Sequence, residues 1–244
     1  MNRLGLALSL MPISGGVAQA APPEQTAQPS RAWKQSFERL GVRDPRVLAA
    51  VDAVPREAFL EADQRKFAWE DRPLPIGYGQ TTSQPSLIAF TLQAAKPGPA
   101  CRALEVGTGC GYQTALLAKL CPHVYSIDIV EPLAERAKQN LEKLGITTAH
   151  VKAGDGYLGW PDAAPFDVII VAAGASRVPQ PLLEQLAVGG RLVIPVGESP
   201  DELSLDVLTK QKNGSVTTER LFPVRFVPLT GSHAERDRAD AGWR

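Results

Sequence analysis

Excess charge of one sign and long apolar runs are both missing from this 244-residue chain. Lysine and arginine together number 26, as do aspartate and glutamate, so the formal net charge is zero. This balance argues against a protein that binds nucleic acid through bulk positive charge, whereas a local basic patch stays open as an alternative. No apolar run reaches the roughly 18 residues of a membrane-spanning helix, so we expect no stable membrane association.

Cysteine and histidine are also scarce. The three cysteines, Cys101, Cys110 and Cys121, are too few and too widely spaced for a disulfide framework or a zinc site. The three histidines form no H-x-x-x-H pair. We therefore expect neither a disulfide scaffold nor a metal. What the chain does have, 44% hydrophobic and 21% charged residues, is typical of one globular domain. We expect a monomer, although the sequence does not determine the oligomeric state.

The amino-terminal thirty residues differ from the rest. Residues 1–20 carry a basic residue, an apolar centre and a small-x-small end, Ala18-Gln19-Ala20, which is the pattern of a secretory signal peptide. The alternatives are a misassigned start codon and an apolar leader with no address. Residues 21–30 are polar and proline-rich, and we expect a disordered tether. We expect a cytoplasmic protein, or a periplasmic one if residues 1–20 are cleaved.

Residues 31–231 are expected to form a single domain, with a helical and loop segment (31–95), a ligand-binding core (96–199) and carboxy-terminal strands (200–231). In the core, strands are predicted over 102–106, 124–128, 148–152, 167–172 and 190–196, and helices over 112–120, 131–144 and 179–187. This alternation is typical of βαβ units, so we expect a Rossmann-like α/β fold with a mostly parallel sheet and helices on both faces.

The flanking segments are less regular. Asp44-Pro45 predicts a helix start, 67–86 is predicted as a long loop, and 86–95 as a helix. After residue 200 an antiparallel hairpin is expected with Asn213-Gly214 at its turn, followed by a last strand over 221–229. The polar tail, 232–244, is expected to fray.

A glycine-rich turn carries the first chemical signal. The predicted strand 102–106 runs into Gly107, Gly109 and Gly111 with G-x-G-x-G spacing, and glycine lets a ligand approach the backbone closely. The dinucleotide fingerprint G-x-G-x-x-G is absent because Tyr112 occupies its last position. Glu105 adds a negative charge that suits a cationic or zwitterionic ligand better than a pyrophosphate.

Two further strand ends carry carboxylates. Asp128 lies about 20 residues beyond the glycines, where an acid can accept the ribose hydroxyls of an adenosine. Asp155-Gly156 follows the next strand, where the acid can accept an adenine amino group. Each feature alone has a structural explanation, since a glycine turn is often only a turn and a strand-end Asp is often a helix N-cap. Their order on three consecutive strands favours a nucleoside site.

The chain resembles a known family. LEVGTGCGY, YSID and AGDGY resemble the cofactor motifs of S-adenosylmethionine-dependent methyltransferases. VPREAF, EDRPLPIGYGQTTSQP, GDGYLGWPDAAPFDVIIV, GGRLVIPVG and VRFVPL resemble protein-L-isoaspartate O-methyltransferases, in unbroken order over roughly 33–231. The block at 70–85 is the most discriminating, because methyltransferases in general lack it. Thr82, Cys110 and Asp128 depart from the residues common in the family, which are Ile, Ser and Glu.

The resemblance implies a Rossmann-like methyltransferase. It would methylate the α-carboxylate of L-isoaspartyl residues in damaged proteins with S-adenosylmethionine as donor and without a metal. Ser83 matches the family's active-site serine. The implied cofactor-binding residues are Glu105, Gly107, Gly109, Asp128, Asp155 and Gly156. The implied substrate-binding residues are Thr82, Gln84, Pro85 and Arg225.

Alternative interpretations stay open from the sequence. Ser83 could instead form a local turn or cap the following helix. A nicotinamide-dependent oxidoreductase would need G-x-G-x-x-G, and a small-molecule methyltransferase would lack the block at 70–85. A binding module of the same fold without turnover is distinguished only by an assay for the methyl ester.

Overall fold

The structure is a computed structural model that describes residues 29–243. Its α-helices are α1 (Pro29–Ala32), α2 (Lys34–Leu40), α3 (Pro45–Ala53), α4 (Pro85–Ala95), α5 (Tyr112–Leu120), α6 (Glu131–Lys143), α7 (Gln180–Gln185) and α8 (Ser232–Asp240). Its strands are β1 (Leu74–Gly77), β2 (Gln80–Thr82), β3 (Arg102–Val106), β4 (His123–Asp128), β5 (Ala149–Ala153), β6 (Phe166–Val171), β7 (Leu186–Gly197), β8 (Leu203–Lys210) and β9 (Val216–Val224). Four 3-10 helices complete it: η1 (Arg56–Phe59), η2 (Arg65–Phe67), η3 (Gly156–Leu158) and η4 (Pro161–Ala163). The signal-like leader and most of the tether lie outside the described residues.

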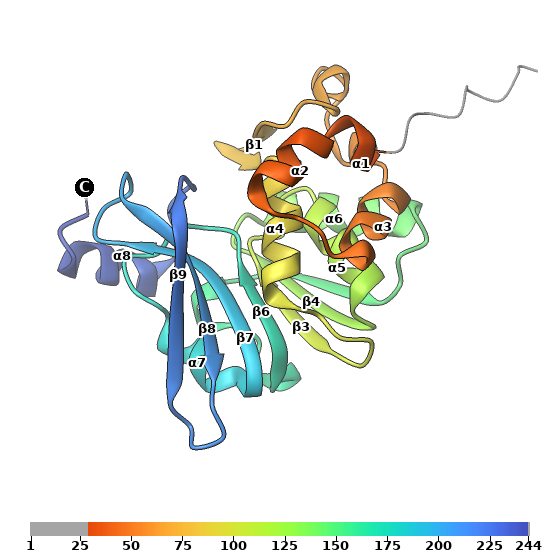
Figure 1. Cartoon of the computed structure of the whole chain (residues 1–244). Coiled ribbons are helices and arrows are strands. Elements are labelled where there is room, and N and C mark those ends of the chain that lie inside the picture. Colours follow the sequence, from red (N-terminus) through yellow and green to blue (C-terminus); the bar gives the residue numbers. More distant parts are fainter. Residues whose placement is uncertain (1–28, 244) are drawn as a thin grey trace, which may run out of the picture.

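A seven-stranded sheet in the order β5-β4-β3-β6-β7-β8-β9 forms the centre of the molecule (Figure 1). The first five of these strands pair in parallel, and β8 and β9 add an antiparallel edge. Within this sheet the chain enters at β3, passes through β4 to the edge strand β5, and then crosses back to β6, which lies on the other side of β3. The Rossmann-like α/β prediction is confirmed, with a switch in strand order between β3 and β6.

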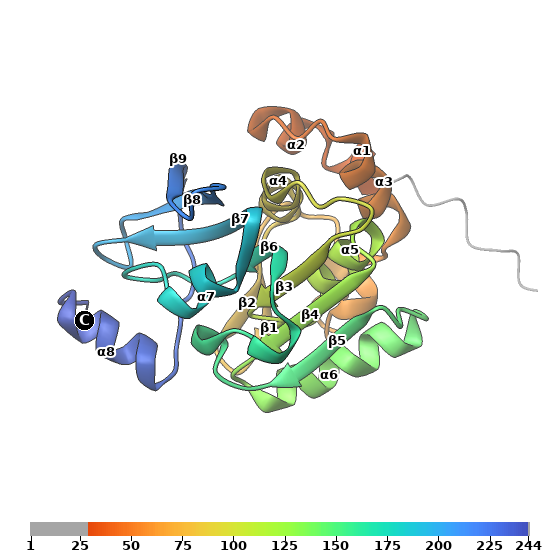
Figure 2. The ribbon, with the colours of Figure 1, turned by 90° about the horizontal axis from the view of Figure 1, so that it is seen from below.

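Both faces of the sheet are covered by hydrophobic clusters. Successive side chains of a strand point to opposite sides, so alternate residues belong to different clusters. In β6, Val168 and Ile170 belong to one hydrophobic cluster, which takes in residues of α3 to α6. Ile169 and Val171 belong to the other, which includes Leu182 of α7 and a residue of α8. Figure 2 shows α2, α3 and α4 together on one side of the sheet and α8 away from them.

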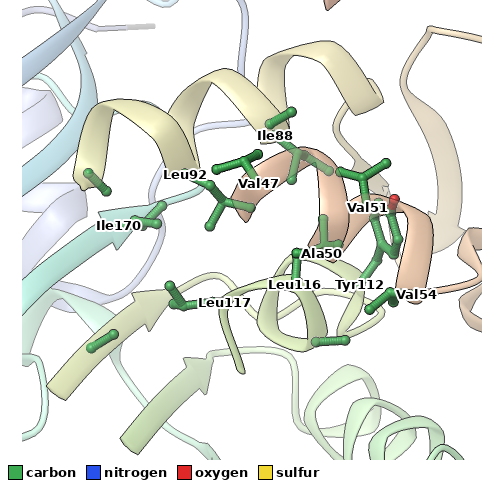
Figure 3. Packing of buried hydrophobic residues seen from close by; sticks show 14 of the residues in the cluster. Val47, Ala50, Val51, Val54, Ile88, Leu92, Tyr112, Leu116, Leu117 and Ile170 are labelled. Carbon is green, nitrogen blue, oxygen red and sulfur yellow. The ribbon is translucent and has the colours of Figure 1, made fainter. Parts of the chain in front are cut away.

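Helix α3 begins where the sequence predicts. The Asp44 side chain accepts a hydrogen bond from the Arg46 amide, and Pro45 occupies the first helical position. Val47 and Val51 are almost fully buried and point toward α4 and α5, as Figure 3 shows. This packing holds the amino-terminal helices against the core that carries the site.

Three predictions about the flanking segments were wrong in part. The predicted loop 67–86 contains the short antiparallel pair β1–β2, which reverses at Gly77, Tyr78 and Gly79, all with positive φ. The predicted strand 221–229 does not form separately, because β9 runs to Val224 and the chain then leaves the sheet. The tail is not frayed throughout, since residues 232–240 form α8, where the Tyr157 hydroxyl donates to Asp237 at 2.7 Å.

The structure also corrects the prediction about cysteine. Cys101 and Cys121 form a disulfide across a sequence separation of 20, whereas Cys110 is free and buried. The two half-cystines lie at the start of β3 and the end of α5, which are far apart in sequence but adjacent once α5 packs on the sheet. Spacing along the chain does not reveal such a pair, because the fold decides it.

Candidate active site

A cleft opens at the carboxyl ends of β3 and β6, where the strand order switches. It encloses about 820 Å³, its open mouth included. Its walls come from the segments after β3, β4 and β6, from the β2–α4 connection and from residues 227–230. Ligands of open α/β sheets bind at such a switch point, so this cleft is the candidate cofactor site.

The glycine loop lines this cleft with Gly107 and Gly109. Gly107, Gly109 and Gly111 have φ angles of 93°, 56° and 90°, a region that favours glycine. A Cβ on Gly107 would lie 3.3 Å from the Ala172 side chain, so the β3 and β6 ends pass too closely for a larger residue. The predicted role of the loop as a close backbone surface therefore fits its geometry.

Glu105 is the most unusual charged group of the cleft. It is 0% exposed, and its Oε2 accepts hydrogen bonds from the hydroxyls of Thr114 and Ser126. Its Oε1 and the amide Nε2 of Gln113 are buried without a hydrogen-bond partner among residues 29–243. Burial raises the pKa of Glu105 to about 7, against the hydrogen bonds that would lower it. The Gln113 side chain lies beside the same carboxyl and favours its ionised form, and Glu105 Oε1 can accept a hydrogen bond from a ligand such as an ammonium group.

Asp128 lies at the end of β4 and is almost buried. Its Oδ2 accepts from the Gly109 amide at 2.7 Å, and its Oδ1 accepts from the Val130 amide at 2.9 Å. Burial raises the pKa of this carboxyl, while the two amides favour its ionised form. Each oxygen keeps lone pairs that can accept a further hydrogen bond, so a diol can bind beside the glycine loop.

The structure places Gly156 in the lining of the cleft but not Asp155. The Asp155 carboxylate accepts from the Tyr157 amide at 3.0 Å and caps η3. A Cβ on Gly231 would lie 2.7 Å from the Asp155 oxygens, so the chain before α8 passes close to this carboxylate. The predicted contact of Asp155 with a ligand stays a prediction, and its capping role is what the structure shows.

Ser83 lies where two clefts meet. It lines the cleft described above and a second, more open one, together with Thr81, Ala172 and Val227. The N-cap of α4 is Gln84, so Ser83 is not the cap that the sequence left open as an alternative. The Ser83 side chain is thus available at the passage between the clefts.

The other predicted substrate residues divide between the clefts. Thr82 is buried in the wall of the first cleft, whereas Gln84 and the exposed Arg225 line the second. Pro85 begins α4 and lines neither cleft, so the structure does not place it at the site. The remaining lining of the second cleft is mostly apolar, with one carboxylate, and comes from Leu40, Pro73, Leu87, Asp201, Phe222, Pro223, Val224 and Phe226.

Several residues of the site were missed in the sequence. Ile129 is 43% exposed although it is apolar, and it lines the first cleft directly after Asp128. The sequence did contain a signal for Ile129, because an apolar residue directly after a strand-end acid can pack against the flat ring of a bound nucleoside. Thr114 and Ser126, which lie on α5 and β4, donate hydrogen bonds to Glu105, and no local sequence pattern marks them.

Among residues 29–243, no cluster of His, Cys, Asp or Glu could hold a metal. Within the same range, no helix has the length and hydropathy needed to cross a bilayer.

The fold and the cleft together define a Rossmann-like methyltransferase of the S-adenosylmethionine-dependent class. The family model for protein-L-isoaspartate(D-aspartate) O-methyltransferase matches residues 33–234. The chain therefore belongs to the protein-L-isoaspartate(D-aspartate) O-methyltransferase family.

Individual relatives agree with this assignment. A protein-L-isoaspartate O-methyltransferase of Gloeobacter violaceus is 50% identical over 190 residues, which is 78% of this chain and 92% of the relative. One from Opitutus terrae is 48% identical and covers 93% of this chain and 97% of its own. The crystal structure of a beta-aspartate methyltransferase from Plasmodium falciparum in complex with S-adenosyl-L-homocysteine superimposes with a TM-score of 0.71 at 28% identity, over 83% of this chain and 98% of that one.

Proposed function

We propose that this chain transfers a methyl group from S-adenosylmethionine to the α-carboxylate of L-isoaspartyl residues in damaged proteins and peptides. The ester then closes to a succinimide and reopens, partly to normal aspartate, so the reaction begins repair. Family membership supports the activity. The structural observation that supports it is the position of Ser83 at the junction of the cleft at the β3 and β6 ends and a second, mostly apolar cleft that Arg225 also lines.

The residues of the first cleft fit S-adenosylmethionine. When bound, this cofactor supplies a methyl group on a positively charged sulfur. Glu105 offers a carboxylate to a cation, and Asp128 offers two oxygens to the ribose hydroxyls. Gly107 and Gly109 let the ligand lie against the backbone. Asp155 and Gly156 complete the proposed cofactor set at the adenine end.

The second cleft is proposed to hold the substrate carboxylate. A carboxylate with an ordinary pKa is already ionised at neutral pH, so the reaction needs no strong general base. What the site must supply is alignment of the two reactants and exclusion of water. The Ser83 hydroxyl donates a hydrogen bond to the substrate oxygen in this proposal. Arg225 attracts the carboxylate, while Thr82 and Gln84 shape the passage.

The test compares the wild-type protein with Ser83→Ala on a peptide that contains one isoaspartyl residue, with the matched aspartyl peptide as the control substrate. We expect methyl ester only on the isoaspartyl peptide and a loss of about 100-fold in kcat for the variant. Thermal unfolding should stay near wild type because Ser83 caps no helix. Wild-type turnover in the variant would remove Ser83 from the mechanism. Cofactor binding without ester formation by the wild type would instead identify a non-catalytic module.

The oligomeric state and the compartment are proposals as well. We propose a monomer that acts on proteins and peptides without nucleic acid, which size-exclusion chromatography with light scattering tests. The Cys101–Cys121 disulfide favours the periplasmic alternative, because disulfides persist in oxidising compartments. Mass spectrometry of the protein from cells decides between them. A chain that starts at Ala21 means export, and one that starts at Met1 or Asn2 means cytoplasmic location.

A further inference from the structure

Arg56 is a buried cation outside the clefts. It begins η1, in the VPREAF segment, and is only 2% exposed. Its Nη1 donates to the carbonyl oxygens of Ala68 and Glu70 at 3.1 and 3.0 Å, and its Nη2 donates to those of Arg72 and Ser83 at 3.1 and 3.2 Å. One guanidinium therefore contacts four backbone positions spread over sixteen residues.

Such a group is costly to bury. Burial lowers the pKa of Arg56, because the charged form loses its hydration. Carbonyl oxygens replace the lost water at Nη1 and Nη2, whereas Nε is buried without a hydrogen-bond partner among the described residues. A methionine of similar length would fill the space without that cost, but it would leave the carbonyl oxygens without their donor. The arrangement therefore defines the path of the backbone more than it adds to stability.

The backbone so defined is the segment that presents Ser83. Ala68, Glu70 and Arg72 precede the β1–β2 hairpin, and Ser83 follows it, so Arg56 joins the two ends of this segment. A second contact joins the same ends, since the Ser86 amide donates to the Asp71 side chain at 2.9 Å. Arg56 holds the Ser83 carbonyl by a hydrogen bond, while Ser83 itself lines both clefts.

We infer that Arg56 is a positioning residue for methyl transfer: it sets the orientation of Ser83 by binding the Ser83 carbonyl and the loop before the β1–β2 hairpin. The inference rests on the proposed role of Ser83. It explains why a charged residue is buried at this position, where an apolar residue of similar length would fill the same space. Arg56 donates no hydrogen bond to the glycine loop, although its charge acts on Cys110 and Tyr112, so its loss should change kcat far more than cofactor affinity.

The experiment uses Arg56→Met and Arg56→Lys in the full chain. The matched control is Lys210→Met, because the Lys210 ammonium donates to three carbonyls, those of Leu183, Glu184 and Leu186, away from both clefts. For each variant we would measure kcat and KM with the isoaspartyl peptide, the Kd for S-adenosylhomocysteine and the thermal midpoint. Both Met variants are expected to lose thermal stability.

We expect Arg56→Met to lose about 100-fold in kcat, Arg56→Lys to lose less, and Lys210→Met to keep wild-type kcat. The Kd for S-adenosylhomocysteine should stay within about threefold in all three, since this readout follows the cofactor cleft. A wild-type kcat in Arg56→Met, or a loss of kcat in Lys210→Met as large as in Arg56→Met, would overturn the inference. If Arg56→Met does not fold, Arg56→Lys decides, and wild-type kcat there overturns it.

A double variant separates this inference from the proposed function. If Arg56 acts through Ser83, then Arg56→Lys should cause little further loss of kcat in the Ser83→Ala background. Fully multiplicative losses would overturn it. A wild-type kcat in Ser83→Ala refutes the proposed role of Ser83 itself, whereas a damaged Ser83→Ala beside a wild-type Arg56→Met refutes only the role of Arg56.

Discussion

Replacing Glu105 by Gln should stabilise the protein, and by an amount that depends on pH. The carboxyl group is fully buried, and its pKa rises from the ordinary 4.5 to about 7. At about 1.4 kcal/mol per pH unit, the ionised form is therefore about 3 kcal/mol more costly in the folded protein than in the unfolded one. Gln has nearly the same shape and still accepts hydrogen bonds from Thr114 and Ser126, but it cannot ionise.

The direction of this pH dependence is set by whether the folded or the unfolded protein holds more protons on Glu105. Below pH 4.5 the carboxyl group is protonated in both states, so Glu105 causes no pH dependence there. Between pH 4.5 and about 7 the folded protein holds a proton that the unfolded chain has released, so its free energy of unfolding falls as the pH rises. Above about pH 7 the full penalty of about 3 kcal/mol is present.

The assay is urea unfolding of the wild type and Glu105→Gln without cofactor, at several values between pH 5 and pH 8. Ionisable groups distant from Glu105 contribute equally to both proteins, so the difference between their unfolding free energies reports Glu105 and its interaction with the nearby Asp128. We expect this difference to grow by about 3 kcal/mol, in favour of the variant, across that range. A difference that is constant with pH would refute the elevated pKa and the burial argument behind it.

The same variant should bind its cofactor more weakly, because an ionised partner strengthens a hydrogen bond. We expect the Kd for S-adenosylmethionine to rise about tenfold, measured by calorimetry at pH 8. The stabilised fold and the weakened binding together would show that Glu105 is kept for its charge rather than for packing. Unchanged affinity would mean that Glu105 does not face the ligand.

Two further predictions concern contacts outside the clefts. Tyr157→Phe removes the hydrogen bond from Tyr157 to Asp237 that ties η3 to α8, so we expect a loss of about 1 kcal/mol in urea unfolding and a higher Kd for S-adenosylhomocysteine with unchanged peptide KM. An unchanged Kd would mean that α8 does not support the cofactor cleft. Reduction of the Cys101–Cys121 disulfide should lower the free energy of unfolding by about 3 kcal/mol, because the bond closes a loop of about 20 residues. Dithiothreitol should have no such effect on the Cys101→Ala/Cys121→Ala variant, and an equal effect there would contradict the assignment.

The parallel core was predictable because its patterns are local. In strand β6, residues 168–171 form an unbroken apolar run, as expected of a strand segment buried on both faces. Helix α3 starts at Asp44-Pro45, where one side chain and one fixed φ angle define the first turn. The glycine loop and Asp128 could be placed together from the sequence, since parallel strands bring their carboxyl ends to one edge of a sheet.

Elements outside the core were harder to predict. The β1–β2 pair has only four and three residues, too few for an alternating pattern. Helix α8 is mostly polar, and its contacts with Tyr157 and Arg177 come from segments distant in sequence. Neither has a strong period of its own, so tertiary contacts rather than local propensity decide them.

The sequence by itself determined the order of strands and helices in the parallel core, the glycine turn and the family, because these depend on residue types at short, fixed spacings. Only the tertiary structure decided that Cys101 meets Cys121 and that Arg56 reaches Ser83. Each of these depends on which distant segments become neighbours. Burial then changes the chemistry of the side chains involved, since a carboxyl or guanidinium group cut off from water takes its properties from the few atoms around it.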